Sequence, residues 1–430
     1  MAQRLSLCMI VRNEEAFLPR CLESVKGVVD EIIVVDTGST DGTLTVARRF
    51  GAAIKEVPWC SDFSAARNAS LDLATGDWIL MLDADEALVP ESAASLPALL
   101  ADPSVEGYFI QMRHLIGSIA QPEVEVSPLF RLWRNRPAYR FAGEIHEQIL
   151  PSILRANPKA KTAYSSLQAV HYGYLREVKA AKGKHDRNRL LLEARLLRNP
   201  QDSFAHFNLG IEYYEQQQFQ KAAAAFEAAL AGAKQEDPWR TKLVKAYAAT
   251  LYELQAWERL FAFLDGEIRR YPDYTDLHFL AATARAAVGQ HREAADGFAR
   301  CLRVGPAPSP PYASIDPGAG SYKAALELGR EYEALGMNAE AASAYKQAAK
   351  SRPGWHTPLK LLAVLLGRAA QDQEILQELA AFFPSGQYAD RVQMATLLLH
   401  ARRPHLVIAE LQPLLQAGKL DRAGKFVLAR

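Results

Sequence analysis

The chain has 430 residues, and at roughly 150 residues per domain this length predicts two or three folding units. Its 50 Lys and Arg residues nearly balance 49 Asp and Glu residues, so the net charge of +1 argues against a general nucleic-acid binder. Hydrophobic residues make up 49% of the chain. No apolar run reaches the roughly 18 residues needed to span a bilayer, so we expect no transmembrane helix.

The N-terminal residues run directly into a strand-like segment, without the pattern of a secretion signal. The four cysteines are scattered and lack Cys-x-x-Cys spacing. This usage is typical of a reducing compartment, so we expect a cytoplasmic protein. The thiols are expected to be buried small hydrophobes rather than disulfides or zinc ligands: Cys8, Cys21, Cys60 and Cys301.

Short apolar runs alternate with amphipathic helical patterns from Leu5 to about Tyr172. Strands are predicted over residues 7–11, 32–35, 53–57 and 78–82, and helices over 17–25, 44–50 and 65–73. Strand, helix and strand repeated in this way predict a parallel sheet with right-handed crossovers. The ligand site of such a sheet lies at the carboxyl ends of its strands.

The second half of the chain repeats itself. From about residue 177 the strand signals vanish and helical periodicity dominates. The pattern resembles the tetratricopeptide repeat, a pair of helices about 34 residues long in which small residues let the helices cross closely. Six residues of one repeat are matched at identical spacing in a later one: Leu209, Gly210, Tyr213, Ala222, Phe226 and Ala229 by Leu328, Gly329, Tyr332, Ala341, Tyr345 and Ala348.

Weaker repeats are predicted over residues 239–272 and 275–306. They are followed by residues 305–321, which are rich in proline and glycine and are not expected to be helical. Such a loop is either a neutral insertion or a functional arm over a binding face. The domain prediction is therefore a catalytic domain over 1–175, a basic helical linker over 176–200 and a repeat domain over 201–430 that contains this loop.

Two carboxylates, Asp83 and Asp85, follow the fourth predicted strand with only Ala84 between them. Burying an unpaired charge is costly, so these side chains need partners. A divalent cation would supply one, with water and phosphate oxygens completing its coordination shell. Asp-x-Asp alone is a weak motif, because it also occurs as a helix cap or a solvated turn.

Three further polar clusters lie at strand ends of the same sheet, at residues 12–14, 36–42 and 62–68. Together with Asp-x-Asp they resemble the nucleotide-sugar-dependent glycosyltransferases of family 2, across roughly residues 4–175. The resemblance implies an α/β catalytic domain of the GT-A fold with a Rossmann-like mixed sheet. An all-α tetratricopeptide-repeat solenoid would follow it.

The same resemblance implies a nucleotide-sugar donor and a divalent cation, Mn²⁺ or Mg²⁺. The cation would be held by Asp85 and His171, with Asp83 near the ribose or reaching the cation through water. Arg67 and the cation would stabilise the charge of the leaving diphosphate. Capping of a helix stays open for Glu14 and Asp41, and a packing role stays open for His171. The donor site would be formed by Val11, Arg12, Asn13, Glu14, Asp36, Gly38, Ser39, Asp62, Arg67, Asn68, Asp83 and Ala84.

Residues 141–147 are the expected acceptor-activating region. In inverting members of the family an acid in the second half of the domain removes the acceptor proton. Glu147 is the first candidate, Glu144 and His146 are the alternatives, and a structural role for Glu147 stays open.

Two basic stretches are either solvated faces or contacts to a diphosphate or an acidic acceptor. The first flanks Trp133 and the second precedes the repeats: Arg131, Arg134, Arg136 and Arg140, then Lys179, Lys182, Lys184, Arg187 and Arg189. Motifs of P-loop ATPases, zinc peptidases and α/β-hydrolases do not occur in the sequence.

The leading hypothesis is transfer of a hexose or N-acetylhexosamine from a nucleotide diphosphate sugar, with UDP as the expected nucleotide, to a protein or peptide presented by the repeats. The arrangement resembles bacterial peptide glycosyltransferases that modify Ser or Cys of bacteriocin precursors. One alternative is an enzyme acting on a lipopolysaccharide-core or lipid-linked sugar. Another is a non-catalytic repeat adaptor with a vestigial transferase half. A homodimer through the repeats also stays open.

Overall fold

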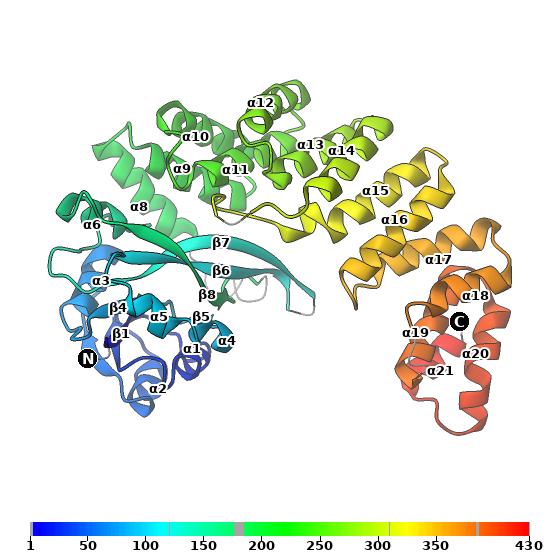
Figure 1. Ribbon diagram of the computed structural model, residues 1–430, viewed down its shortest axis with the longest axis horizontal. Helices are drawn as coiled ribbons and strands as arrows, with labels where there is room; N and C mark the ends of the chain where they lie inside the picture. The colour runs from blue at the N-terminus through cyan, green and yellow to red at the C-terminus, as the bar shows by residue number, and fades with distance from the viewer. Residues whose placement is uncertain (1–2, 120, 176–184, 309, 384–386, 430) are drawn as a thin grey trace. The chain divides into compact units, whose positions relative to one another are not determined.

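The computed structural model describes residues 3–119, 121–175, 185–308, 310–383 and 387–429 (Figure 1). The chain forms two compact units, the first of Met1–Phe263 with Pro308–Pro317, and the second of Leu264–Ala307 with Gly318–Arg430. The division differs from the predicted boundaries at 175 and 200, because the first helices after the sheet belong to the same compact unit as the sheet.

The sheet of the first unit is mixed, with the strand order β3-β2-β1-β4-β7-β6-β8-β5. The strands β1 to β4 are parallel, as the alternation of strands and helices predicts. β7 is antiparallel to both β4 and β6, and β5 is antiparallel to β8, so the sheet is mixed as the GT-A resemblance implies. The strands are β1 Leu5–Val11, β2 Glu31–Asp36, β3 Ala53–Glu56, β4 Trp78–Met81, β5 Glu86–Leu88, β6 Gly107–Ser118, β7 Gln121–Arg134 and β8 Thr162–His171.

Helices pack on the sheet and enclose its apolar strands. The continuous apolar runs of β1 and β4 are buried because both strands lie inside the sheet, and Leu7, Trp78 and Leu80 have no exposed surface. The predicted strands and helices of this half are confirmed to within two residues at each end. The helices are α1 Leu18–Ser24, α2 Thr43–Arg49, α3 Phe63–Leu71, α4 Pro90–Ala93, α5 Leu96–Ala101 and α6 Leu150–Ala156.

The first unit continues into helical hairpins. A glycine allows the close crossing of α9 and α10, because a Cβ atom on Gly210 would lie 2.4 Å from the ring of Phe226. This is the close crossing that the repeat pattern predicts. The helices are α8 His185–Arg198, α9 Ser203–Glu215, α10 Phe219–Gly232 and α11 Arg240–Glu253, and α12 Trp257–Arg270 spans the boundary between the units.

The second unit has the same construction. A Cβ atom on Gly329 would lie 2.5 Å from the ring of Tyr345, which repeats the crossing of the first hairpin. The predicted start of a repeat at Thr275 is confirmed. Of the described helices, none is long and apolar enough to cross a membrane. Those of this part are α13 Thr275–Ala287, α14 His291–Val304, α15 Tyr322–Ala334, α16 Asn338–Ser351, α17 Thr357–Ala369, α18 Asp372–Ala380, α19 Tyr388–His400, α20 Pro404–Gln416 and α21 Arg422–Leu428.

The expectation that residues 305–321 contain no helix is wrong at one place. A short 3-10 helix, η1, covers Pro317–Gly320. Proline fits the first position of a helix, where its fixed φ is suitable and its missing N–H would have no partner in any case. A single such turn therefore forms within a sequence that excludes a longer helix.

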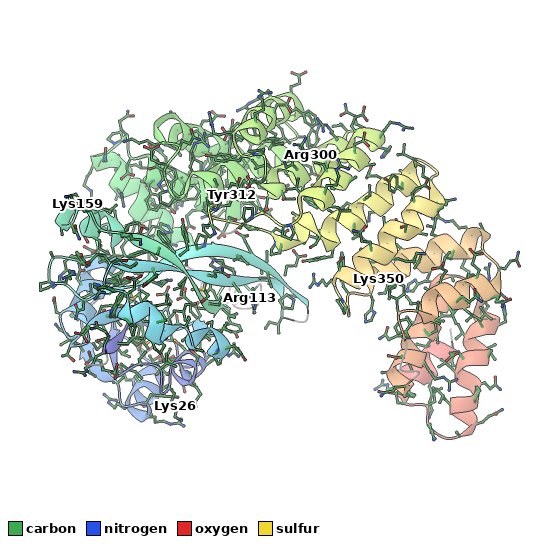
Figure 2. All side chains as sticks on the ribbon, in the orientation of Figure 1. Lys26, Arg113, Lys159, Arg300, Tyr312 and Lys350 are labelled. Atoms are coloured by element: carbon green, nitrogen blue, oxygen red, sulfur yellow. The ribbon has the colours of Figure 1, made fainter. Side chains whose placement is uncertain are left out.

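The segment Pro308–Pro317 packs on the sheet of the first unit. Ile315 and Val126 of β7 exchange both of their backbone hydrogen bonds, each 2.9 Å long. The N–H of Ala313 donates to Thr241 Oγ1 of α11 at 3.0 Å, and the Ser314 hydroxyl donates to the Glu125 carboxylate. Tyr312, labelled in Figure 2, is buried.

This docking should weaken when Glu125 loses its charge. Burial raises the pKa of the Glu125 carboxyl, but the ammonium groups of Lys245 and Lys242 outweigh burial and lower that pKa to about 2. Glu125→Gln should therefore speed amide exchange at Ile315 at pH 7 by roughly 10- to 100-fold, the equivalent of about 1.5–3 kcal/mol for a hydrogen bond to a charged group. Hydrogen-exchange mass spectrometry of residues 312–317 measures it.

The sign of the pH effect follows from the lowered pKa. The carboxylate stabilises the docked segment above its ordinary pKa of about 4.3, and this contribution is lost as the pH falls toward 2. The difference in the rate of amide exchange at Ile315 between Glu125→Gln and the wild type should therefore become smaller as the pH falls from about 4.3 toward 2. Glu23→Gln, in an exposed pair with Lys26, serves as the control. Equal exchange in the wild type and Glu125→Gln at pH 7 would contradict the prediction.

Candidate active site

The turn between β4 and β5 carries the Asp-x-Asp motif. Glu86, the first residue of β5, accepts the N–H of Asp83 through Oε2 at 2.9 Å and so closes the turn. Arg131 of β7 lies beside it, with Nη2 at 2.7 Å from Glu86 Oε1 and 3.0 Å from Asp83 Oδ2. Ala84 is buried in the turn. The motif is thus held at the carboxyl end of β4, where the sequence predicts the ligand site.

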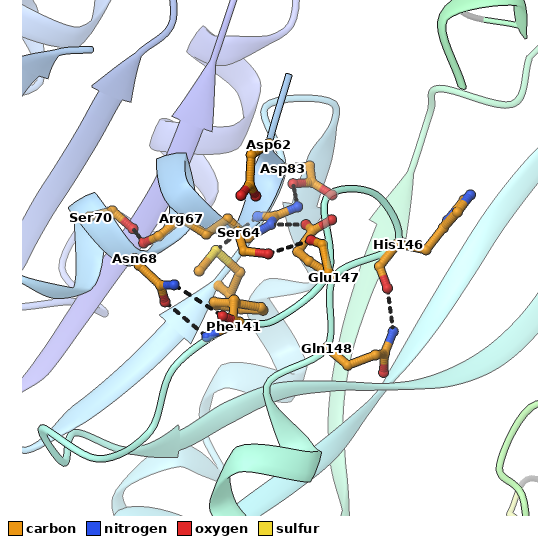
Figure 3. A network of polar contacts seen from close by, with 12 residues as sticks. Asp62, Ser64, Arg67, Asn68, Ser70, Asp83, Phe141, His146, Glu147 and Gln148 are labelled. Carbon is orange, nitrogen blue, oxygen red and sulfur yellow. Dashed lines mark hydrogen bonds and ion pairs between the residues drawn. The ribbon is translucent and has the colours of Figure 1, made fainter. Parts of the chain in front are cut away.

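Arg67 of α3 connects this turn to the loop that contains Glu147 (Figure 3). Its Nη2 lies 2.9 Å from Asp83 Oδ1, and its Nε donates to Glu147. Burial raises the pKa of the Asp83 carboxyl, but the guanidiniums of Arg67 and Arg131 outweigh burial and hold that pKa well below its usual value. Asp83 is therefore ionised and held by two arginines. Arg131 was predicted only as part of a basic stretch.

Breaking this cluster should destabilise the first unit. The side chain of Arg67 is only 9% exposed, and Arg67→Ala would leave the Glu147 carboxylate buried without its cation. We expect the free energy of unfolding to fall by about 3–5 kcal/mol. Arg140→Ala is the matched control, because Arg140 and its partner Asp72 are 38% and 55% exposed; it should cost less than about 1 kcal/mol. Chemical denaturation followed through near-UV circular dichroism measures both, and equal costs would contradict the prediction.

The loop of residues 141–149 is fastened to α3. Asn68 makes two hydrogen bonds with the backbone of Phe141, donating to its oxygen at 3.0 Å and accepting from its N–H at 2.8 Å. Asp62 caps α3 by accepting the N–H of Ala65 at 3.1 Å. Both side chains, which were predicted to bind the donor, thus bind protein groups: Asn68 fixes the loop and Asp62 caps α3.

The two acidic candidates for the acceptor base have different surroundings. Glu147 is 9% exposed and contacts Arg67 beside the Asp-x-Asp turn. Glu144 lies 2.7 Å from Arg198 of α8. Its own backbone N–H and then the Arg198 side chain lower the pKa of its carboxyl. The structure therefore brings Glu147, and not Glu144, into the cluster that contains Asp83.

His146, the third candidate, points away from Arg67 and Glu147 in Figure 3. Its backbone has a positive φ of 52°, and its buried Nε2 has no hydrogen-bond partner among the described residues. Burial, followed by the charges of Lys242 and Arg195, lowers the pKa of His146 to about 4. The imidazole is therefore neutral near pH 7.

Asp85 and His171 form the part of the site that suits a cation. Asp85 Oδ1 lies 3.5 Å from His171 Nε2, and the two side chains are 9% and 15% exposed. A Cβ atom on Gly173 would lie 2.4 Å from Asp85 Oδ2 and 2.6 Å from His171 Nε2, so a residue without a side chain is needed there. A carboxylate oxygen and an imidazole nitrogen beside this space fit a divalent cation.

The described residues hold no group of three or more His, Cys, Asp or Glu side chains placed to bind one ion. Two of the three predicted ligands, Asp85 and His171, lie together, whereas Asp83 is engaged by Arg67 and Arg131. The other ligands of a cation would come from a diphosphate and water, as is usual for ions bound with phosphate.

His114 of β6 contacts His171 on the side of the imidazole ring that faces away from Asp85. Its Nδ1 lies 3.0 Å from Nδ1 of His171, and its Nε2 lies 2.7 Å from Ser127 Oγ on β7. Burial, then His171 and Lys242, lower the pKa of His114 to about 3. Sequence reasoning missed His114, because only the pairing of β6 with β8 places it opposite His171.

The loops after β1 and β2 interlock at the same edge of the sheet. Asp36 accepts the N–H groups of Gly38 at 3.0 Å and Ser39 at 2.9 Å. Asn13, with a φ of 55°, accepts the N–H of Thr40 at 2.7 Å and donates its own N–H to Ser39 Oγ at 2.9 Å. These predicted donor-site residues therefore shape each other's loops. Val11 ends β1, and Arg12 is exposed beyond it.

Asp41 lies just before α2, whose N-cap is Gly42 without a side-chain cap. Asp41 accepts the N–H of Thr43, the first residue of α2, at 3.0 Å. The neighbouring Glu14 donates its backbone N–H to Thr43 Oγ1 at 2.8 Å.

The arginines of the first basic stretch contact protein groups. Arg134 donates to the carbonyls of Val105 and Asp102, and Arg136 pairs with Glu106 at 2.6 Å. In the second stretch Arg187 lies over the ring of Phe63 and Arg189 pairs with Glu193. Lys179, Lys182 and Lys184 lie outside the described residues.

Comparison with known proteins agrees with this architecture. Residues 6–121 match the model of the family described as glycosyl transferase family 2, and residues 203–231 match that of the tetratricopeptide repeat. The chain is 38% identical to a TPR repeat-containing protein of Synechococcus elongatus over 275 residues, which are 63% of this chain and 65% of that protein.

Two further relatives match shorter stretches. An uncharacterized glycosyltransferase of Rickettsia felis is 36% identical over 25% of this chain and 37% of its own length. The SPbeta prophage-derived glycosyltransferase SunS of Bacillus subtilis is 29% identical over 48% of each chain. The chain thus spans less than two thirds of each of these three relatives. The mixed sheet, the Asp-x-Asp turn and the family matches agree with one another. The N-terminal part of this chain is a family 2 glycosyltransferase domain, and its C-terminal part contains a tetratricopeptide repeat.

Proposed function

We propose that the protein is a glycosyltransferase that moves a sugar from a nucleotide diphosphate sugar to an acceptor, with a divalent cation held by Asp85 and His171. The observation that carries the proposal is this pair, which faces the space kept open by Gly173 beside the Asp-x-Asp turn of a family 2 domain. The imidazole nitrogen favours Mn²⁺ over Mg²⁺, which prefers oxygen ligands. The bound cation would neutralise charge that develops on the departing diphosphate.

Glu147 is the proposed base of the reaction. The acceptor forms a bond to the anomeric carbon while the bond from that carbon to the diphosphate oxygen breaks, and the acceptor proton passes to the Glu147 carboxylate. Attack from the side opposite the diphosphate inverts the anomeric centre. Arg67, bonded to Glu147 and Asp83, orients the base relative to the Asp-x-Asp turn. The interlocked loops that contain Asn13 and Asp36 form the proposed nucleotide side of the site.

A protein or peptide is the proposed acceptor, and a UDP-hexose or UDP-N-acetylhexosamine is the proposed donor. Tetratricopeptide repeats present concave surfaces that suit extended peptides, and this supports the acceptor class. Cys8, Cys21 and Cys301 are buried as expected, whereas the expectation of burial is wrong for Cys60, which is exposed. All four cysteines are free, which favours a reducing compartment such as the cytoplasm. Dimerisation through the repeats stays a prediction.

One assay tests the proposal. The full chain is incubated with Mn²⁺, a panel of nucleotide sugars and a bacterial lysate, and labelled products are identified by mass spectrometry. A hexose or N-acetylhexosamine added to a polypeptide, and lost when EDTA removes the cation, is the expected result. Label that enters only lipid or lipopolysaccharide would overturn the peptide acceptor. No turnover of any donor, with or without acceptor, would favour the non-catalytic adaptor.

A further inference from the structure

His114 contacts the proposed cation ligand His171 on the side of its ring opposite Asp85. The proposed reaction assigns no role to His114. The register of β6 and β8 pairs the two residues across neighbouring strands. Their Nδ1 atoms lie 3.0 Å apart, and His114 Nε2 lies 2.7 Å from Ser127 Oγ. Tyr174 packs against both rings, with centroid distances of 5.2 Å to His114 and 4.5 Å to His171. Both imidazoles are therefore fixed in position.

Only one direction of hydrogen bonding leaves His171 ready to bind a cation. A neutral imidazole carries one proton, so a contact between two Nδ1 atoms requires one of them to donate and the other to accept. If His171 donates through Nδ1, its Nε2 lone pair is free to face Asp85. If His114 donates instead, the proton of His171 is on Nε2 and blocks the cation.

Ser127 can complete the first direction, because a hydroxyl group both donates and accepts hydrogen bonds. When His114 accepts at Nδ1, its own proton lies on Nε2, and the Ser127 hydroxyl oxygen at 2.7 Å accepts that proton. The hydrogen bonds then run in one sense from His171 through His114 to Ser127. Histidine ligands of metals usually donate their second N–H to a carboxylate, a backbone carbonyl or water; here an imidazole takes that place.

We infer that His114 is a positioning residue that sets the tautomer and orientation of His171, so that His171 Nε2 faces the cation space next to Asp85. The inference rests on the cation site of the proposed function. His114 itself does not touch the cation or the substrates. Removing its acceptor atom should weaken cation binding by about 10- to 100-fold, as the loss of such a hydrogen-bond partner does in other metal sites.

A pair of variants separates hydrogen bonding from packing. His114→Phe keeps a ring beside Tyr174 but cannot accept a hydrogen bond, so it should lose most of the affinity for Mn²⁺. His114→Asn places an amide oxygen close to the former Nδ1 position and should restore affinity to within a few-fold of the wild type. Affinity is measured from free Mn²⁺ by electron paramagnetic resonance, with UDP at one fixed concentration in every sample to supply the diphosphate oxygens and a protein-free sample as the blank. His206→Phe, a histidine of α9 bonded to the carbonyl of Pro200 at 2.9 Å, should leave affinity unchanged.

A second measurement uses the protein with a saturating concentration of the diamagnetic cation Mg²⁺, because without a cation the Asp85 carboxylate, 3.5 Å from His171 Nε2, favours a proton on that nitrogen. Long-range ¹H–¹⁵N spectra of the histidine side chains show which nitrogen carries the proton. The expected result is a proton on Nδ1 of His171 and on Nε2 of His114. A proton on Nε2 of His171 in the wild type would overturn the inference.

The outcomes distinguish the inference from the proposed function. If the wild type binds Mn²⁺, Asp85→Ala does not, and His114→Phe binds like the wild type, the positioning role fails while the cation site stands. If the wild type binds no Mn²⁺ at any accessible concentration, the cation site fails and the inference fails with it. The positioning role is supported if His114→Phe loses affinity for Mn²⁺ and His114→Asn regains it.

Discussion

Replacement of Asp85 by alanine is expected to lower sugar transfer by about 10³-fold or more. Asp85 supplies the carboxylate of the two-residue cation pair, and the described residues offer no third His, Cys, Asp or Glu side chain placed to take over. A cation contributes several kcal/mol to the stabilisation of charge in the transition state, and about 4 kcal/mol corresponds to 10³-fold in rate. Initial rates of transfer at saturating donor and Mn²⁺ measure the loss.

The loss should equal that caused by removing the cation. EDTA should lower the activity of the wild type as far as the substitution does, and EDTA should change Asp85→Ala little further. Asp72→Ala is the matched control, because Asp72 is 55% exposed and pairs with Arg140 away from the Asp-x-Asp turn. Metal-dependent turnover of Asp85→Ala near the wild-type rate would show that the cation is bound elsewhere.

Local sequence patterns predicted the framework of the fold. β1 and β4 are continuous apolar runs because both their faces are covered, and this pattern needs no knowledge of the tertiary structure. Gly210 and Gly329 marked the helix crossings, since each lies against an aromatic ring of its partner helix. The docking of Ile315 on Val126 could not be predicted, because no periodicity connects two segments that are far apart in the chain.

The candidate site was predicted in part. The family resemblance placed Asp85 and His171 at one cation, and the two side chains lie together. It did not predict that Arg67 and Arg131 both engage Asp83. The orientation of each side chain depends on which cation or imidazole the neighbouring strands bring close. Residue spacing along one segment does not contain this information.

Several predicted donor-site residues bind other parts of the protein. Asn68 holds the backbone of Phe141, and Asp36 holds the loop that follows β2. A sequence motif indicates that the residue type matters at these positions. It does not indicate whether the side chain binds a ligand or the protein backbone. For Asn68 the structure shows contact with the loop that contains Glu147, so the constraint still acts on the proposed site.

Glu147→Gln is expected to lower transfer by between about 10² and 10⁴, the range of general base catalysis. Glutamine has nearly the same shape, and its amide oxygen still accepts from Arg67 Nε, so the loop should keep its position. An amide cannot take the acceptor proton. The donor KM should therefore stay close to that of the wild type while kcat falls, and steady-state kinetics with varied donor separates the two constants.

Glu144→Gln is the matched comparison, because it makes the same chemical change three residues away in the same loop. Glu144 pairs with Arg198 of α8, outside the cluster of Arg67 and Asp83, so its substitution should change kcat by no more than a few-fold. The opposite ranking, a large loss in Glu144→Gln and a small one in Glu147→Gln, would move the base to Glu144. Equal small losses in both would leave His146 as the group that takes the proton, because its imidazole is neutral and its Nε2 has no hydrogen-bond partner within the described part of the chain.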